Sequence, residues 1–426
     1  MKINDYSTKN GETVNLSDFV ILVGPNNTGK SQTLRDISSI MSNGQEASNS
    51  TIVTDIDYED TSYSAFMQEL SVVENPDMAN RHNVSGISPS LNNRNTENLN
   101  TNQLEGLQTS GGDVTSSDLV RRRLMQFKVA FLNASSRLEI ANSCETYNFH
   151  EGDPSNVLQK LYEAPSARRE LNSAFNNIFQ QDIVLDFSST RTFSLRVDDD
   201  LDNINGNIVT PTGNPENDQE IGEKIDDQGA GYRSLAGVIL SLLLAQQRVV
   251  LLDEPEAFLH PAQAREFGIW LSEHARSTSG QIVISTHNSH FLDGVLSGNA
   301  GTTVYRLNRS DDHTQYNKIS EDVISNLSSD SLLSSLRVMN GVFQKGIVIC
   351  EGGSDKLVYR YVADEILGER NAEYIPCNRI HNAPKIANVL RAGAIPQVIV
   401  ADIDILSSPS IFRDSLEALS GKIWGV

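Results

Sequence analysis

The chain has 426 residues, of which 55 are acidic and 34 basic, giving a formal net charge of −21. Its apolar fraction of 38% suffices for a sizeable core and excludes a wholly disordered chain, and the length suggests two to three domains. The net charge excludes a histone-like nonspecific polyanion binder and confines any DNA binding to a local basic surface.

Two classes of segment are missing from the sequence. No apolar run approaches the ~18 residues of a membrane span, and the N-terminus has no apolar secretory segment. The three cysteines, Cys144, Cys350 and Cys377, show no C-x-x-C spacing and argue against a disulfide framework. We therefore expect a reduced cytoplasmic protein with no membrane partner.

The first 41 residues predict a strand, a glycine-rich loop and a helix. Residues 19–23 form a continuous apolar run, as expected of a buried parallel strand, and the loop GPNNTGKS fits G-x-x-x-x-G-K-[ST]. In such a loop, backbone amides and the helix N-terminus face a phosphate. Lys30 would reach the β- and γ-phosphates, and Ser31 would ligate Mg²⁺. The expected ATP-binding residues of the loop are Gly24, Asn26, Asn27, Thr28, Gly29, Lys30 and Ser31.

The next segment, about residues 42–117, has a different composition. Residues 90–103 are rich in Asn, poor in apolar residues and without periodicity, which predicts a polar surface insertion that is partly disordered. Within the insertion, residues 51–62 alternate well enough for one or two strands.

Residues 119–180 are expected to form a helical and dimerisation region. This region carries the basic groupings that could meet phosphates, namely Arg121 to Arg123, Arg137, and Arg168 with Arg169. A solvated helical face, or salt bridges at a subunit interface, explains them equally well.

From residue 229 to 307 the pattern alternates helices with apolar strands and predicts an α/β sheet. One strand ends in Asp253, placed to hold the metal through water, and Glu254, placed to activate the attacking water. The next strand leads to His287, which could polarise the attack or sense the phosphate, or make only a structural hydrogen bond. A glycine-rich helix start with Gly229, Gly231 and Ser234 precedes both strands and can bind a phosphate.

A polar link, residues 308–331, leads to a second α/β unit. Its apolar strands at 346–350 and 396–401 end in acids, and residues 356–367 predict a helix between them. Carboxylates at the C-terminal ends of parallel strands converge on one crevice, where a divalent cation must neutralise them. Mg²⁺ or Mn²⁺ held there could activate water and stabilise a phosphodiester in transition. The acids are Glu351, Asp355, Asp402 and Asp404.

The order of P-loop, glycine-rich helix start, DEPEAFLHP and STH resembles the ABC-type ATPase heads of SMC, Rad50-like and OLD (overcoming lysogenization defect) proteins. The resemblance implies that Gly229, Gly231 and Ser234 contact ATP bound to another subunit, and that His287 is a switch histidine.

The acid-bearing strands look like a TOPRIM module. That resemblance makes Glu351 the first metal ligand and possible base, Asp402 and Asp404 the main Mg²⁺ ligands, and Asp355 a supporting ligand. Together, the two resemblances indicate the OLD nucleases, which include effectors of the Gabija system and of some retrons.

The expected fold is α/β, with an ABC/SMC-type ATPase domain at residues 1–330 followed by a TOPRIM domain at 331–426. The TOPRIM domain is expected to be truncated or reduced at its C-terminus, because only 22 residues follow Asp404. The family pattern implies an ATP-hydrolysing, metal-dependent DNA endonuclease of antiphage defence. It also implies a homodimer or higher homo-oligomer through the ATPase heads, with a possible partner protein or nucleic acid.

Two alternatives remain open. The first is a regulatory ATPase, a sensor or scaffold whose catalytically silent TOPRIM domain acts through a partner protein. The second is a DNA-repair or clamp ATPase like the Rad50 heads, which requires residues 42–228 to extend as a coiled coil. The composition of that segment does not support a coiled coil.

Overall fold

The computed structural model describes most of the chain. It covers every residue except 44–49, 110–111, 151, 190, 200, 202–203, 205–207, 211–220, 299–300, 311–312, 321–322, 324–339, 369–371 and 423–426. Within the described residues, no helix combines the length and apolarity needed to cross a bilayer.

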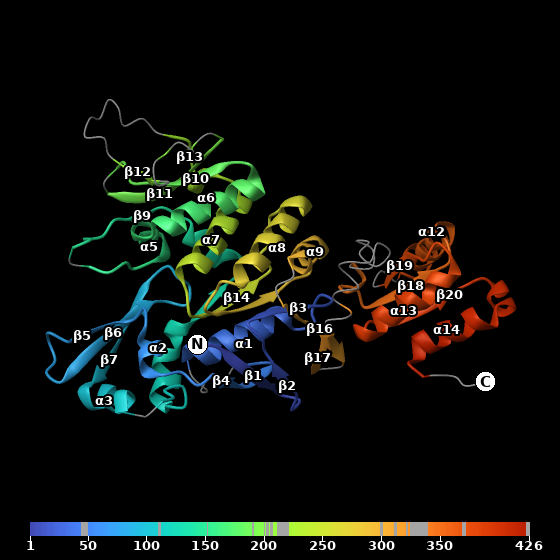
Figure 1. The fold of residues 1–426 in the computed structure, drawn as a ribbon, viewed down its shortest axis with the longest axis horizontal. Helices are drawn as coiled ribbons and strands as arrows, with labels where there is room; N and C mark the ends of the chain where they lie inside the picture. The colour runs from blue at the N-terminus through green and yellow to red at the C-terminus, as the bar shows by residue number, and fades with distance from the viewer. Residues whose placement is uncertain are drawn as a thin grey trace.

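A six-stranded sheet forms the centre of the larger domain (Figure 1). Its order is β17-β16-β3-β15-β14-β8, with β17 antiparallel to β16 and the other pairings parallel. The strands are β3 (Phe19–Val23), β8 (Val129–Leu132), β14 (Val249–Asp253), β15 (Gln281–Ser285), β16 (Thr303–Ser310) and β17 (His313–Ile319). The strand before the P-loop, β3, is therefore separated from β14 and its acids by β15.

Helices cover both faces of this sheet, which explains why its inner strands β3, β14 and β15 are largely apolar. Phe19, Ile21 and Val23 belong to one apolar cluster with α7 (Ala230–Leu244), α8 (Pro261–Ala275) and α9 (Ser289–Ser297). Val20 and Leu22, pointing the other way, belong to a second cluster with α1 (Lys30–Asn43). Side chains alternate across a strand, so a strand buried on both faces reads as a continuous apolar run.

The polar insertion is ordered where it is described, so the prediction of disorder is wrong for residues 90–103. Asn98 Nδ2 donates to Asn83 Oδ1 at 3.0 Å, and Asn75 Nδ2 donates to the same oxygen at 3.0 Å. These cross-strand amide bonds stabilise a sheet with little apolar signal. The insertion contains β4 (Val53–Tyr58), α2 (Tyr63–Met67), β5 (Ser71–Glu74), β6 (Arg81–Ile87), β7 (Arg94–Asn100) and α3 (Thr101–Thr109). The strand β4 pairs with β1 (Ile3–Thr8), which also pairs with β2 (Thr13–Asn15).

The region expected to be largely helical contains one strand of the central sheet. The four residues of β8 pair with β14, because a short apolar run adopts whichever structure its neighbours offer. The remaining elements are η1 (Val120–Leu124), η2 (Met125–Lys128), α4 (Ala134–Ile140), β9 (Cys144–Glu145), α5 (Val157–Glu163) and α6 (Pro165–Phe179). A second sheet follows, with β10 (Asp182–Asp186), β11 (Thr192–Asp198), β12 (Ile208–Val209) and β13 (Glu223–Lys224), before η4 (Ile225–Asp227).

The C-terminal domain lies at one end of the molecule, beyond β16 and β17 (Figure 1). Its parallel sheet has the order β19-β18-β20, so the two strands predicted to carry acids are neighbours. Its elements are β18 (Gly346–Cys350), α12 (Gly353–Tyr361), η5 (Val362–Leu367), β19 (Ala372–Pro376), η6 (Ile380–Asn382), α13 (Ala383–Ala392), β20 (Gln397–Val400), η7 (Ile403–Ser407) and α14 (Pro409–Ser420).

The two domains share one apolar core. The cluster on the α7 face of the central sheet continues through Val304, Ile319 and Val342 to Ile347 and Ile349 of β18. The segment expected to be a polar link is therefore partly structured, because β17 pairs with β16 over its whole length. Residues 311–312, 321–322 and 324–331 of that segment lie outside the described part of the chain.

Candidate functional site

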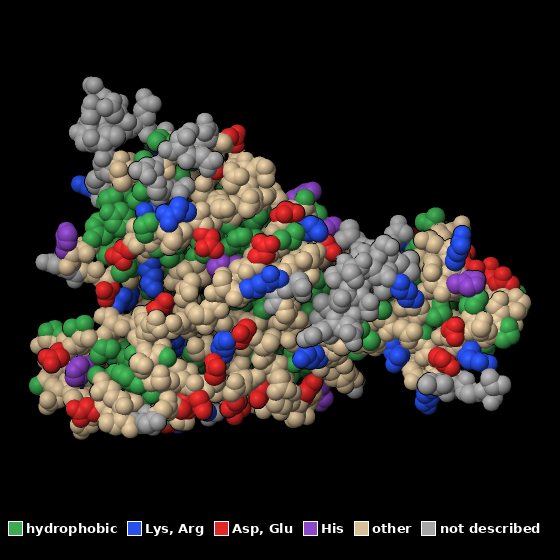
Figure 2. Space-filling view, in the orientation of Figure 1, with side chains coloured by type: hydrophobic (Ala, Val, Ile, Leu, Met, Phe, Trp, Pro, Cys, Tyr) green, Lys and Arg blue, Asp and Glu red, His purple; other side chains and the backbone are tan. Residues whose placement is uncertain are grey.

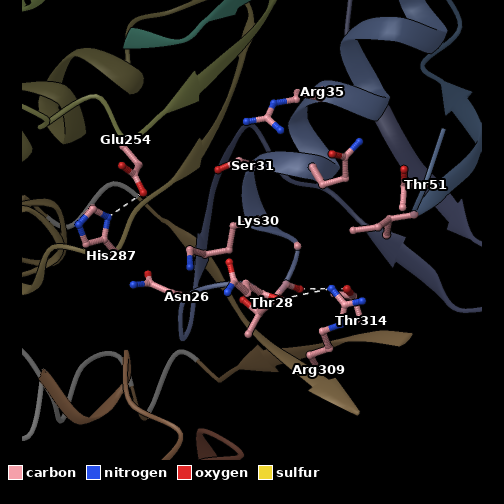
Figure 3. A pocket seen from close by; sticks show the side chains of 14 residues that line it. Asn26, Thr28, Lys30, Ser31, Arg35, Thr51, Glu254, His287, Arg309 and Thr314 are labelled. Atoms are coloured by element: carbon pink, nitrogen blue, oxygen red, sulfur yellow. Dashed lines mark hydrogen bonds and ion pairs between the residues drawn. The ribbon is translucent and has the colours of Figure 1, made fainter. Parts of the chain in front are cut away.

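A cavity of about 780 Å³ opens over the P-loop (Figure 3). It brings together the loop, the start of α1, the segment before β4, the ends of β14 and β15, and the β16–β17 hairpin. Its lining residues are Asn26, Asn27, Thr28, Gly29, Lys30, Ser31, Gln32, Arg35, Thr51, Ile52, Glu254, His287, Arg309 and Thr314. Eight predicted site residues thus line one cavity, while Gly24 and Asp253 lie at the ends of the strands that lead into it.

The P-loop lysine is buried, and its ammonium group is hydrogen-bonded to carbonyls of the loop itself. Lys30 Nζ donates to the carbonyls of Gly24 at 2.8 Å and Pro25 at 2.9 Å. Burial lowers the pKa of Lys30, and the nearby carboxylates of Glu254 and Asp253 oppose that shift. A triphosphate that receives these ammonium protons must therefore draw Lys30 away from the loop carbonyls.

The backbone conformation and the close packing at position 24 require glycine. Its φ is +138°, and a Cβ at this position would lie 2.4 Å from the carbonyl oxygen of Leu307 on β16. Such a contact is far inside van der Waals range, so the loop approaches β16 as closely as glycine permits.

The two acids after β14 have separate partners. Because Asp253 is in register with Ser285, its Oδ1 accepts a 2.5 Å hydrogen bond from Ser285 Oγ. Glu254 Oε1 lies 2.8 Å from His287 Nδ1 (Figure 3), and this hydrogen bond lowers the pKa of Glu254 and raises that of His287. The predicted base and the predicted switch histidine therefore form one pair.

A third acid of the same loop went unnoticed in the sequence. Glu256 is buried, and burial raises its pKa to about 7 although Thr286 Oγ1 donates to Oε1 at 2.5 Å. The hydrogen bond ties the loop after β14 to the residue before His287. The signal was available in the sequence, because Glu256 is the third acid of DEPEAF.

The predicted glycine-rich helix start lies away from the P-loop cavity of its own chain. Gly229 is the exposed N-cap of α7, and a Cβ on Gly231 would meet Phe258 O at 2.8 Å. Ser234 is only 1% exposed, and its hydroxyl accepts a 3.0 Å hydrogen bond from Arg137 Nε. Contact of these residues with ATP on another subunit stays a prediction.

Arg137 is internal rather than a phosphate contact. It is fully buried and also donates to the carbonyls of Leu132 at 3.1 Å, Asp253 at 2.6 Å and Glu254 at 3.0 Å. It therefore connects the helix α7, through Ser234, to the backbone that carries the acids.

Other basic groupings also have internal partners. Arg123 pairs with Glu97 at 2.6 Å, and Arg168 is buried and donates to the Leu161 carbonyl at 3.0 Å. On the face shown in Figure 2, Lys and Arg side chains are interspersed with Asp and Glu. For Arg123 and Arg168 the structure thus shows partners within the same chain, which differ from both the solvated helical face and the subunit-interface salt bridge that the sequence suggested.

A second cavity, of about 340 Å³, lies at the acid-bearing end of the C-terminal sheet. Its lining residues are Glu351, Asn378, Arg379, Ile380, His381, Asp404, Ile405, Ser407, Ser408 and Ile411. Glu351 Oε2 accepts from the backbone N–H of Asp402 at 3.3 Å, so the strand ends meet as predicted. Asp355 instead caps α12, with Oδ2 accepting from Gly352 N at 2.8 Å.

Carboxylate oxygens are the ligands that Mg²⁺ prefers, and Glu351 and Asp404 share this cavity. Across the described ranges, no three His, Cys, Asp or Glu residues lie close enough together to hold one metal ion. The metal roles of Glu351, Asp355, Asp402 and Asp404 therefore stay predictions.

Several cavity residues could not be found in the sequence. Arg35, Thr51 and Arg309 reach the nucleotide cavity from separate elements, and no motif joins them. Arg379 and His381 follow β19 and place basic groups beside the predicted metal ligands. Their one sequence signal is their place directly after an apolar strand.

Comparisons with known proteins agree with the predicted domain order. Residues 163–293 match the family described as "AAA domain, putative AbiEii toxin, Type IV TA system". Residues 342–404 match "Overcoming lysogenization defect protein-like, TOPRIM domain". The chain thus has an α/β fold, with an ATPase domain followed by an OLD-like TOPRIM domain, as its sequence predicted.

One curated relative is Endonuclease GajA of Bacillus cereus (strain HuB5-5), 22% identical over 211 residues. The match covers 42% of this chain and 31% of the relative, so the chain spans about a third of its length.

Similar solved structures include SMC head domains. The head bound to the C-winged helix domain of ScpA has a TM-score of 0.42, with 10% identity over 76% of this chain and 98% of the other. The SMC head domain from Thermotoga maritima has a TM-score of 0.35, with 14% identity over 75% of this chain and 100% of the other.

Proposed function

We propose that the chain is an ATP-hydrolysing, divalent-metal-dependent DNA endonuclease of OLD type. The observation that carries the proposal is the presence of two sites for phosphate chemistry in one chain. One is the cavity around Lys30, and the other is the cavity where Glu351 and Asp404 meet.

At the first site, the loop amides and Lys30 bind the phosphates of ATP, and Ser31 and Asp253 hold its Mg²⁺. Glu254 acts as the base for the attacking water, and His287 holds Glu254 until the γ-phosphate arrives. The 2.8 Å pair supports this role, because a protonated imidazole beside the carboxylate can turn to the phosphate instead.

At the second site, Glu351 and Asp404 line one cavity and would hold a divalent metal, which would supply Lewis-acid activation of water. Asp402 follows β20 and would complete the ligand set once its carboxylate turned toward this cavity. Arg379 and His381 line the same cavity and bind the phosphodiester there. Asp355 shapes the turn after Glu351 through its bond to the Gly352 amide.

The proposal extends to assembly and biology. Gly229 and Gly231 at the start of α7 contact ATP on a second copy, so the heads pair in a homodimer or higher oligomer. The relative named as an endonuclease and the OLD-like TOPRIM match support a nuclease role. We extend the proposal to DNA as the substrate, to antiphage defence in the cytoplasm and to a further partner protein or nucleic acid, on the resemblance of the motifs to OLD nucleases.

A specific observation favours the alternative of a regulatory ATPase with a silent TOPRIM domain. Asp355, the supporting ligand in the family pattern, has one carboxylate oxygen engaged by the Gly352 amide at 2.8 Å. A helix cap of this kind stabilises α12 without any metal.

One experiment separates the two. Supercoiled plasmid and linear DNA are incubated with the protein in Mg²⁺ or Mn²⁺, with and without ATP, alongside Glu351→Gln and Lys30→Ala. Asp414→Asn, an exposed carboxylate on α14, serves as the matched control. We expect metal-dependent cleavage that Glu351→Gln abolishes, that Asp414→Asn retains, and whose response to ATP disappears in Lys30→Ala.

Intact ATP hydrolysis without cleavage would replace the nuclease with the regulatory ATPase. Unchanged nucleotide affinity in Lys30→Ala would overturn the assignment of the ATP site. Cleavage that persists in Glu351→Gln would move the nuclease chemistry elsewhere.

A further inference from the structure

One buried arginine joins the central sheet to the C-terminal domain. Arg306 on β16 is fully buried, and its guanidinium donates to the carbonyls of Val342 at 3.1 Å, Gln344 at 2.8 Å and Ala394 at 2.9 Å. Burial lowers its pKa to about 10. A guanidinium with several donors in a fixed plane holds such carbonyls in one geometry.

The three carbonyls belong to the segments that lead into the acid-bearing strands. Val342 and Gln344 precede β18, and Ala394 precedes β20. These two segments are also joined to each other, because Ile347 N donates to Pro396 O at 2.8 Å. Arg306 therefore holds the N-terminal ends of β18 and β20. The C-terminal ends of these strands lead to Glu351 and Asp402.

The same stretch of β16 touches the P-loop. Arg306 is in register with Val23, and the carbonyl of Leu307 is the atom that Gly24 approaches so closely. Gly24 and Pro25 supply the carbonyls that hold Lys30. A ligand that draws Lys30 away thus changes the partners of the loop beside Arg306.

A cleft of about 820 Å³ separates the P-loop from the C-terminal domain. Pro25 and Asn26 line it from the loop, and Phe343, Lys345 and Pro396 line it from the segments that lead into β18 and β20. Among the described residues that line this cleft, every side chain is neutral or basic. Nucleotide phosphates at the P-loop would therefore lie beside a cleft surface whose charge attracts anions. Part of that surface belongs to the C-terminal domain.

We propose that Arg306 is the positioning residue through which ATP at the P-loop sets the placement of β18 and β20, and with them the acids of the second site. The inference rests on the proposed function, because it requires ATP at the P-loop. The contacts that connect the two sites are contiguous. They lead from Lys30 to Gly24, from there to β16, and through Arg306 to the N-terminal ends of β18 and β20. They end at Glu351 and Asp402 along these two short hydrogen-bonded strands.

The test compares amide hydrogen exchange with and without AMP-PNP and Mg²⁺, in the wild-type chain and in Arg306→Met. In the wild type we expect nucleotide to change exchange of residues 347–350 and 397–400 by about threefold or more. In Arg306→Met this response disappears, while nucleotide affinity stays within about threefold because Arg306 lies outside the nucleotide cavity. An arginine with only a structural role would leave the nucleotide response in place.

Arg248→Met is the matched control. Arg248 is also buried and donates to a carbonyl, that of Ile87 at 3.0 Å, but this contact lies wholly within the larger domain. Its loss should leave the response of β18 and β20 unchanged. If Arg306→Met fails to fold, Arg306→Lys replaces it, because an ammonium keeps the buried positive charge but lacks the planar guanidinium that holds the carbonyls of both segments.

The possible outcomes distinguish a failure of this inference from a failure of the proposed function. A wild-type chain that binds nucleotide without any change at β18 and β20 overturns the role of Arg306 and leaves the ATP site intact. A response that survives in Arg306→Met, or in the substitute Arg306→Lys, overturns it too. A wild-type chain that binds no nucleotide overturns the proposed function first.

Discussion

Replacing Arg137 tests whether this arginine is structural. In Arg137→Met, four hydrogen bonds are lost, to Ser234 Oγ and to the carbonyls of Leu132, Asp253 and Glu254. Bonds of this charged kind contribute about 1.5–3 kcal/mol each. Relief of the desolvation cost of a buried guanidinium offsets several kcal/mol of their sum. We therefore expect the free energy of unfolding to fall by about 3–5 kcal/mol.

The assay is urea denaturation followed by the fluorescence of Trp270, which lies on α8 of the same domain, in a Trp424→Phe background. Arg122→Met is the control, since Arg122 makes an exposed 3.0 Å pair with Asp118 one helical turn away. Loss of that pair should cost below about 1 kcal/mol.

Unchanged stability of Arg137→Met, combined with a salt-dependent loss of DNA affinity, would refute this reasoning. Such a result would restore Arg137 as a phosphate contact, because a phosphate-binding arginine contributes to the salt dependence of DNA binding.

Three further predictions concern the nucleotide site. Gly24→Ala should destabilise the chain by about 3 kcal/mol and abolish nucleotide binding, because the position has a positive φ and a Cβ there would clash with Leu307. The control Gly106→Ala, with open space around the added Cβ, should do neither. Thermal unfolding and nucleotide titration measure the two effects, and equal behaviour of the two variants would contradict the geometry. Glu254→Gln should retain bound ATP and slow its hydrolysis, and normal single-turnover rates would place the base elsewhere. The pKa of His287 should lie above its ordinary value of 6.5 and return toward it in Glu254→Gln, as followed by NMR of labelled histidine. The pair therefore adds its full stability between about pH 4.5 and 6.5, the ordinary pKa values of Glu254 and His287. This stability is lost as pH rises through the raised pKa of His287 or falls through the lowered pKa of Glu254, and an unshifted titration would count against the pair.

Features whose chemistry is local could be predicted from the sequence. The P-loop could be identified because phosphate binding needs glycines, a lysine and a hydroxyl at fixed spacing between a strand and a helix. The acids after β14, β18 and β20 could be identified because each follows a short apolar run that ends abruptly in charge. Parallel order then brought Glu351 and Asp402 together, as expected.

The sequence misled where apolar periodicity is weak. The strand β7 is polar and is stabilised by amide bonds between side chains on neighbouring strands, which no periodicity reveals. The strand β8 is too short to be told from part of a helix until β14 supplies its partner. Both errors arose because the stabilising interactions are non-local.

The roles of the buried arginines became visible only in the folded chain. Arg137 and Arg306 look like any basic residues in the sequence, yet both are fully buried. Their roles depend on which backbone carbonyls surround them, and those carbonyls come from segments far away in the chain. A guanidinium has the same charge whether it meets DNA, solvent or a carbonyl, so only the folded chain distinguishes these partners.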